Sequence, residues 1–333
     1  LKAIGGECAG AVALHPEKSS PQINPIQASY RVLNENESHD ILSHLKQNPM
    51  LAREDNVRIS GAGAQDKLMI SMLDGNLAIP IGGTVSTHIV KPAIPELKYT
   101  VQNEFFCMQL AQKIGLEVPH TEIIWIKEKP YYLIERYDRT NNRNGQWQRL
   151  HQEDFCQALG LPPEIKYENE GGPSLINCFA FIEQRIQHGR MSAKSKIRLL
   201  QYIIFHFLIG NGDAHAKNFS IIYDQESERL APVYDALCTI MYTHPSKATL
   251  AMKLGGQKRF QFVREKHWIA LSNSLNMRPS FLFSTLSTLS KKIKIASTTL
   301  VSKLNQDEKT ACSVYEEIDK IIQKQSRQLP DKS

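Results

Sequence analysis

The sequence predicts an α+β protein with two lobes: residues 1–139 form a strand-rich lobe and residues 140–333 a mainly helical one. The first 80 residues are rich in Gly, Ser, Asn and Pro and contain only short apolar runs, which is typical of strands and turns. Beyond residue 150, apolar residues recur at three- and four-residue steps, which is typical of helices. The 333 residues accommodate about two domains of ~150 residues. We therefore expect a ligand cleft between the lobes.

The composition is that of a folded, water-soluble protein. Hydrophobic residues make up 41% and charged residues 22% of the chain, which excludes the disordered and fibrous classes. The longest apolar stretch, around Tyr202 to Gly210, is interrupted by His206 and is far shorter than the ~20 residues of a membrane span. Six cysteines without a CxxC pair favour a reducing cytoplasm, and no signal peptide is evident after Leu1. We expect a cytoplasmic protein without membrane contact.

Lys91 is expected at the end of a strand in the first lobe. Residues 86–90 form a β-type run, and Pro92 closes it because proline cannot donate to a strand ladder. The polar stretch at residues 138–148 is interpreted as a linker. The first lobe is predicted to contain strands at residues 68–73, 86–90, 122–127 and 130–136 and a helix at residues 103–114.

The second lobe is predicted to be mainly helical, with one short β hairpin. Two β-type runs, at residues 219–223 and 230–233, flank a polar turn. No repeat with a fixed period is present, which argues against a solenoid. Helices are predicted at residues 152–159, 174–186, 192–209, 278–293 and 308–324.

The segment from Gly210 to Phe219 carries the chemistry. Asp213 is followed five positions later by Asn218, the order found in phosphotransferase catalytic loops, where the aspartate accepts the hydroxyl proton and the asparagine holds a metal ion. The predicted hairpin returns the chain to Asp235, whose carboxylate could complete a Mg²⁺ site with Asn218. The alternative interpretation is structural: Asp213 and Asn218 would form turns and Asp235 would cap a helix.

Two segments of the first lobe could hold phosphates. Lys91 ends a strand and Glu104 opens the next helix, as in the lysine and glutamate pair that positions nucleotide phosphates. Small residues at positions 60–64 would let backbone N–H groups approach an anion closely. Alternatively, Lys91 is a solvated side chain and residues 60–64 are an ordinary flexible loop.

Eight segments together carry a family resemblance: IGGECAGAV, RISGAGAQDK, THIVKP, NEFFCMQLAQKIGLEVP, ERYDR, QEDFCQALG, GNGDAHAKNFS and LAPVYD. In this order, over about residues 4–240, the chain resembles the HipA toxin family of bacterial serine/threonine protein kinases. The resemblance implies a two-lobed, protein-kinase-like fold that uses ATP and Mg²⁺. After about residue 243 the chain matches that family only as a helical pattern.

The resemblance implies a role for each residue that matches a family motif. Asp213 would be the catalytic base, Asn218 and Asp235 would bind Mg²⁺, and Lys91 would contact the ATP phosphates. Glu135 and Tyr137 would offer backbone contacts to adenine. The full set of implied ATP-binding residues is Ser60, Gly61, Ala62, Gly63, Ala64, Gln65, Lys67, Lys91, Glu135, Tyr137, His215, Lys217, Asn218 and Asp235.

The resemblance also implies regulation, and the sequence departs from the family at two places. Ser60 corresponds to an inhibitory autophosphorylation site. Gly61 stands where an apolar residue is common, which could loosen the grip on phosphate. Family members carry a further N-terminal subdomain of roughly 100 residues. This chain begins just after the point where that subdomain should end, so the subdomain is either missing here or supplied by another chain.

Three functions are compatible with these residues. The first is a protein kinase toxin, with an aminoacyl-tRNA synthetase as substrate and a small DNA-binding antitoxin as partner, both implied by the resemblance. The second is a small-molecule phosphotransferase, and the third is a non-catalytic corepressor. The net charge of +6 permits an acidic partner without requiring one. The basic clusters lack the aromatic residues of a single-strand binder, so DNA is expected to associate only through the antitoxin.

His215 has two interpretations of its own. A metal ligand or general base would need a second histidine, cysteine or carboxylate at metal-ligand spacing, and the sequence offers none. The structural alternative is an imidazole that hydrogen-bonds the loop backbone.

Overall fold

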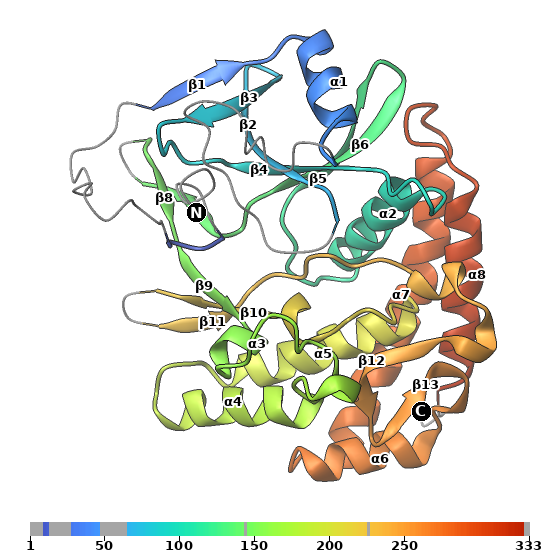
Figure 1. Cartoon of the computed structure of the whole chain (residues 1–333). Coiled ribbons are helices and arrows are strands. Elements are labelled where there is room, and N and C mark those ends of the chain that lie inside the picture. The colour runs from blue at the N-terminus through green and yellow to red at the C-terminus, as the bar shows by residue number, and fades with distance from the viewer. Residues whose placement is uncertain (1–8, 13–27, 47–64, 143–144, 225–226, 330–333) are drawn as a thin grey trace. The chain divides into compact units, whose positions relative to one another are not determined.

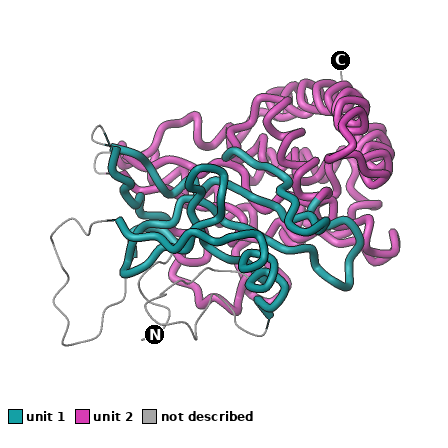
Figure 2. Tube along the Cα trace, turned by 90° about the horizontal axis from the view of Figure 1, so that it is seen from above, with its two compact units in different colours: residues 1–101, 119–152 teal, residues 102–118, 153–333 magenta. Residues whose placement is uncertain are grey.

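The computed structural model describes residues 9–12, 28–46, 65–142, 145–224 and 227–329. Internal contacts divide the chain into two compact units (Figure 2). Unit 1 comprises residues 1–101 and 119–152, and unit 2 comprises residues 102–118 and 153–333. This division differs from a single boundary near residue 139, because residues 102–118, which include most of the helix α2, Thr100–Lys113, group with the C-terminal elements, and residues 140–152 group with the N-terminal ones.

Unit 1 is built on one antiparallel sheet with the strand order β1-β3-β2-β4-β6-β5 (Figure 1). In this register Lys91 of β4 lies opposite Tyr132 of β6. The strands are β1 Ser29–Val32, β2 Leu68–Leu73, β3 Asn76–Ile81, β4 His88–Pro92, β5 Thr121–Ile126 and β6 Lys129–Glu135. The strands predicted in this region are therefore confirmed, with ends shifted by one or two residues.

Two tight turns set the register of this sheet. Asp74 and Gly75 join β2 to β3 with φ of 48° and 80°, the left-handed pair that matches strand twist in a two-residue hairpin. Lys127 and Glu128 join β5 to β6 in the same way, with φ of 46° and 64°. Neither Lys127 nor Glu128 is a glycine, and residues with a Cβ rarely adopt a positive φ. Pairing of the flanking strands therefore holds this turn in a conformation that its residues disfavour.

The short helix α1, Glu35–Ser43, was not predicted from the sequence. Asn34 caps it, since its Oδ1 accepts the Glu37 N–H at 3.0 Å and the Glu37 carboxylate accepts the Asn34 N–H at 2.9 Å. This reciprocal capping box fixes the start of the helix. Leu42 then packs with the apolar side chains of β2 and β3 in the core of unit 1.

Unit 2 is mainly helical, and α5, Lys194–Leu208, which carries ten buried residues, contacts α4, α7 and α8. Helices α7 and α8 run side by side (Figure 1). The α-helices that follow α1 are α2 Thr100–Lys113, α3 Phe155–Ala158, α4 Leu175–Gln187, α5, α6 Glu265–Ser274, α7 Pro279–Leu304 and α8 Val314–Arg327. In the described residues, none of the helices has the length and apolar character to span a membrane.

Two predictions around the lobe boundary were wrong. The expected linker at 138–148 contains the paired strands β7 Arg139–Asn141 and β8 Trp147–Arg149. The expected helix at 152–159 begins only at Phe155, because the Asp154 side chain accepts the Gln157 N–H and caps it there. The preceding residues form β9, His151–Asp154, in a sheet with β10 Ser220–Tyr223 and β11 Glu228–Leu230. A further pair, β12 Thr249–Leu254 and β13 Gln257–Arg259, was also not predicted.

Candidate active site

The segment predicted to carry the chemistry, Gly210 to Phe219, starts where α5 ends. Gly210 follows with φ of 71°, and a Cβ there would lie 2.5 Å from the Ile240 side chain, so the reversal of the chain requires glycine. The Asn211 N–H donates to the His206 carbonyl at 2.8 Å, and the Gly212 N–H donates to Thr239 Oγ1 at 2.7 Å. The segment therefore leaves the helix in one defined direction.

Asp213 is exposed, while its backbone is held on both sides. Its N–H donates to Asn211 Oδ1 at 3.0 Å, and its carbonyl accepts the His215 N–H at 2.7 Å. Its carboxylate accepts the hydroxyl of Tyr167 at 2.7 Å. A carboxylate that faces solvent on a fixed backbone can receive a proton from an incoming hydroxyl group.

Asn218 and Asp235 come together although 17 residues separate them. Asn218 ends the short 3₁₀ helix η3, Ala216–Asn218, and its Nδ2 donates to Asp235 Oδ2 at 2.8 Å. Asn218 Oδ1 accepts the His215 N–H at 3.2 Å. Asp235 has φ of 55°, a left-handed conformation that non-glycine residues rarely adopt. The structure thus joins two residues predicted as metal ligands.

The donor set of this pair fits Mg²⁺. Both side chains carry oxygen atoms, and Mg²⁺ is commonly bound through one or two carboxylates together with substrate phosphates. The described part of the chain contains no group of three or more His, Cys, Asp or Glu side chains that could hold a metal alone. Asn218 and Asp235 would therefore need oxygen ligands from a nucleotide to complete the shell.

His215 and His206 differ in their surroundings. His215 Nδ1 is buried without a hydrogen-bond partner among the described residues, while the His215 backbone N–H donates to the Asp213 carbonyl at 2.7 Å and to Asn218 Oδ1 at 3.2 Å. Burial lowers the pKa of His215, although the charge of Asp213 opposes this. His206 belongs to α5 and its side chain is buried. Burial lowers the pKa of His206 to about 4, so its imidazole is neutral at pH 7. The Lys217 carbonyl accepts the Tyr234 hydroxyl at 2.8 Å.

Sequence reasoning missed two residues that shape the site. Tyr167, 46 residues before Asp213, donates to its carboxylate and contacts the His215 ring edge to face, with centroids 5.2 Å apart. Asn103 of α2 is fully buried and binds both the N–H and the carbonyl of Cys238, which fixes the backbone three residues after Asp235. The adjacent glycines at 171 and 172 were the local signal for a tight turn beside Tyr167.

Three predicted ATP-binding residues, Gln65, Lys67 and Lys91, lie on or beside the sheet of unit 1. Lys91 is buried on β4, with its ammonium group 5.7 Å from the centroid of the Tyr132 ring. Gln65 Nε2 donates to the Pro92 carbonyl at 3.3 Å, and Lys67 directly precedes β2. Positions 60–64, the predicted phosphate loop with Ser60, Gly61, Ala62, Gly63 and Ala64, lie outside the described residues. Lys91 belongs to unit 1 and Glu104 to unit 2, so their pairing stays a prediction.

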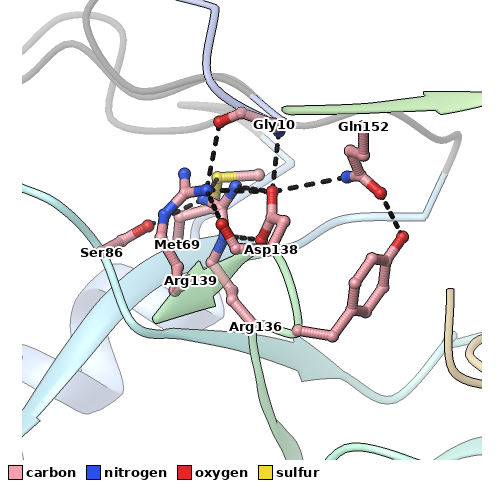
Figure 3. A network of polar contacts seen from close by, with 8 residues as sticks. Gly10, Met69, Ser86, Arg136, Asp138, Arg139 and Gln152 are labelled. Atoms are coloured by element: carbon pink, nitrogen blue, oxygen red, sulfur yellow. Dashed lines mark hydrogen bonds and ion pairs between the residues drawn. The ribbon is translucent and has the colours of Figure 1, made fainter. Parts of the chain in front are cut away.

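The predicted adenine-binding segment leads into a buried charge network (Figure 3). Glu135 is exposed at the end of β6, and its N–H donates to the His120 carbonyl at 2.9 Å. The Tyr137 hydroxyl donates to Gln152 Oε1. Directly after it, Asp138 binds the guanidinium groups of two arginines and the Gly10 N–H; the members of the network are Gly10, Met69, Ser86, Arg136, Asp138, Arg139 and Gln152.

One cavity in unit 2 borders the segment that contains Asp213. It has a volume of about 30 Å³ and is lined by residues that include His206, Asn211 and Ala214. This is room for one or two water molecules, so the cavity is too small to be a nucleotide site.

Comparison with known proteins gives concordant matches. Residues 59–323 match the family of HipA-like C-terminal domains. The putative kinase Y4mE of Sinorhizobium fredii is 42% identical over 260 residues, which are 77% of this chain and 60% of that protein. The serine/threonine-protein kinase toxin HipA of Shewanella oneidensis is 29% identical over 331 residues, which are 95% of this chain and 74% of that toxin. The chain thus spans about 60% of the length of the first relative.

Solved structures agree with these relatives. A chain of the Shewanella oneidensis complex of HipA, HipB and operator DNA superposes with a TM-score of 0.79 and 25% identity, over 96% of this chain and 76% of that one. The Helicobacter pylori proinflammatory kinase CtkA superposes with a TM-score of 0.54 over 81% of this chain and 90% of its own. Its identity is 12%, so it bears on the fold alone. The predicted two-lobed, kinase-like α+β fold is confirmed.

Proposed function

The chain belongs to the family of HipA-like C-terminal domains, and from this premise we propose that it is an ATP-dependent serine/threonine protein kinase. Its relatives are kinases by name, and one of them is a serine/threonine-protein kinase toxin. The observation that carries the proposal is the convergence of Asn218 and Asp235, with 2.8 Å between Nδ2 and Oδ2, on the loop that presents the exposed carboxylate of Asp213.

The proposed reaction transfers the γ-phosphoryl group of ATP to a serine or threonine hydroxyl. The hydroxyl oxygen forms a bond to the γ-phosphorus, the bond from that phosphorus to the ADP oxygen breaks, and the hydroxyl proton passes to the carboxylate of Asp213. A cation held by Asn218 and Asp235 would neutralise charge on the phosphate oxygens. In unit 1, Lys91 would pair with ATP phosphates, as would Gln65, Lys67 and positions 60–64.

The adenine contacts can be narrowed to particular groups. The Glu135 N–H already donates to the carbonyl of His120, just before β5, at 2.9 Å. A contact from Glu135 to adenine would therefore use its carbonyl oxygen as acceptor. Tyr137 would supply a backbone donor in the same segment. In unit 2, the buried Nδ1 of His215 and the ammonium of Lys217 are the remaining proposed contacts to the nucleotide.

The proposal is tested by labelling a bacterial lysate with γ-labelled ATP, Mg²⁺ and purified protein. We expect a labelled protein band with the wild type and at least ~100-fold less label with Asp213→Asn, the lower range of what a positioned base supplies. Label in soluble hydroxyl compounds instead would favour a small-molecule phosphotransferase. An absence of ATP turnover would favour a non-catalytic corepressor.

Regulation by autophosphorylation at Ser60 is a second part of the proposal. A phosphoserine adds about −1.5 to −2 charges, which would repel the incoming triphosphate. Phosphopeptide mass spectrometry after incubation with ATP should find phosphate on Ser60 in the wild type and none in Asp213→Asn. Ser60→Ala should stay unphosphorylated and still bind ATP. Equal phosphate in both active and inactive protein would reject this part.

A toxin role with an antitoxin partner is the third part. The superposable HipA chain comes from a complex with HipB and operator DNA. We propose a small HipB-like DNA-binding antitoxin as partner, DNA contact only through it, and an aminoacyl-tRNA synthetase as the phosphorylated protein. Expression with and without a neighbouring helix-turn-helix protein tests this: growth arrest should occur without the partner and be relieved with it.

A further inference from the structure

We propose that Tyr167 is a positioning residue that holds the carboxylate of Asp213 through Oδ1 and so leaves Oδ2 to accept the substrate hydroxyl. This inference rests on the proposed kinase function and assigns a role to a residue outside the catalytic segment. In the part of the chain that the structure describes, Tyr167 is the only hydrogen-bond donor to the Asp213 carboxylate, at 2.7 Å from its hydroxyl to Oδ1.

The backbone around Tyr167 is built to hold the phenol in place. The N–H groups of Glu170 and Gly172 both donate to the Tyr167 carbonyl, at 2.9 Å each. A Cβ on Gly172 would lie 2.7 Å from the Lys166 carbonyl carbon and 2.8 Å from the Tyr167 carbonyl oxygen, so only glycine closes this turn. Glu168 ties the same turn to β12, because its carboxylate accepts the Lys253 N–H at 2.5 Å and lies 3.4 Å from the Lys253 ammonium.

The ring of Tyr167 is also fixed by its neighbours. It meets the His215 ring edge to face, with an interplanar angle of 74°, and the Lys166 ammonium lies 4.9 Å from its centroid. These contacts already restrict the rotation of the Tyr167 side chain. The hydrogen bond to Asp213 therefore costs little additional side-chain entropy.

The phenol acts as a donor throughout the neutral range. Burial raises the pKa of Tyr167, and the adjacent carboxylate of Asp213 raises it further, so the hydroxyl keeps its proton. The other charged or titratable groups near this pair are Lys166, Glu170, His215 and Asp235. A carboxylate that accepts one bond from a fixed phenol has its second oxygen directed elsewhere, which is the orientation that a base needs for catalysis.

Tyr167→Phe tests the inference because it removes the hydroxyl and keeps the ring against His215. The matched control is Tyr223→Phe, whose hydroxyl donates to Glu153 Oε2 at the same distance of 2.7 Å. The reaction to measure is γ-phosphoryl transfer from ATP to dephosphorylated casein. We expect kcat to fall about 10- to 100-fold in Tyr167→Phe, with the KM for ATP unchanged, and neither value to change in the control.

The double variant with Asp213→Asn separates positioning from a structural role. If Tyr167 acts through Asp213, Tyr167→Phe should not lower kcat further in a protein that already carries Asp213→Asn. A further loss of the same size in that background, or a wild-type kcat in Tyr167→Phe, overturns the inference. A higher kcat would mean that the hydroxyl blocks the base, which also overturns it. Failure of the kinase proposal looks different, since the wild type itself would then transfer no phosphate to casein.

Discussion

Two aspartates of this chain, Asp138 in unit 1 and Asp213 in unit 2, have opposite surroundings. Asp138 is buried and accepts bonds from Arg136 at 2.8 and 3.0 Å and from the Gly10 N–H at 2.7 Å, with Arg139 at 3.0 Å. Asp213 is exposed, and in the described residues its carboxylate accepts a hydrogen bond from Tyr167 alone.

The difference separates a carboxylate that holds structure from one that is available for chemistry. Burial alone would raise the pKa of Asp138, but the charges and hydrogen bonds of Arg136, together with Arg139, outweigh burial and lower it. Both carboxylate oxygens of Asp138 accept hydrogen bonds from buried donors, Oδ1 from Arg136 and Oδ2 from Arg136 and the Gly10 N–H, so this carboxylate is committed to the fold. A count of hydrogen-bond partners therefore distinguishes the two roles, which the residue type alone does not.

The largest effect is expected from Asp138→Asn, which should lower the free energy of unfolding. Removal of one charge from a buried ion pair leaves the guanidinium groups uncompensated, which costs about 3 kcal/mol or more in the free energy of unfolding. Urea denaturation measures this, with Asp213→Asn as the matched exposed control, expected within about 0.5 kcal/mol of the wild type. Equal stability of the two variants would remove the structural half of the comparison.

A second effect concerns acid stability and comes from His206. Burial lowers its pKa from the ordinary 6.5 to about 4, so between these values the unfolded chain binds more protons than the folded one. The contribution of His206 is complete above pH 6.5 and is lost as the pH falls to about 4, by up to ~3 kcal/mol. In His206→Gln, the free energy of unfolding should therefore fall less steeply between pH 6.5 and about 4 than in the wild type. Asp138, with its lowered pKa, loses its contribution only below its ordinary 3.8.

A smaller effect is expected on ligand binding from Asp235→Ala. If Asn218 and Asp235 hold Mg²⁺ with the nucleotide, Mg²⁺ should tighten ATP binding in the wild type by about 5- to 150-fold, the usual range for coupled ligands. Calorimetry with and without Mg²⁺ should find this coupling abolished in the variant. Unchanged coupling would show that the pair holds no cation.

Local patterns were sufficient for much of the fold. The apolar periodicity of α5 and the proline after Lys91 depend on neighbouring residues, so the sequence predicted both elements. The Asp213 and Asn218 spacing likewise placed two proposed site residues on one loop. Helix α1 could have been predicted too, because Asn34 and Glu37 have the spacing of a capping box.

Other features depend on contacts between distant parts of the chain. Tyr167 reaches Asp213 across 46 residues, and Asn103 binds Cys238 across 135. No periodicity or short motif encodes such a pairing, since it arises only when packed elements bring the side chains together. The hairpin of β7 and β8 was missed for a related reason: its polar residues resemble a linker until they are paired.

The central claim is that Asp213 serves chemistry and Asp138 serves structure. The most direct measurement compares Asp213→Asn and Asp138→Asn for phosphoryl transfer to a lysate protein and for the free energy of unfolding in urea. We predict that Asp213→Asn loses at least ~100-fold in transfer at wild-type stability, whereas Asp138→Asn loses about 3 kcal/mol of stability. Near wild-type transfer by a fully folded Asp213→Asn would contradict the account.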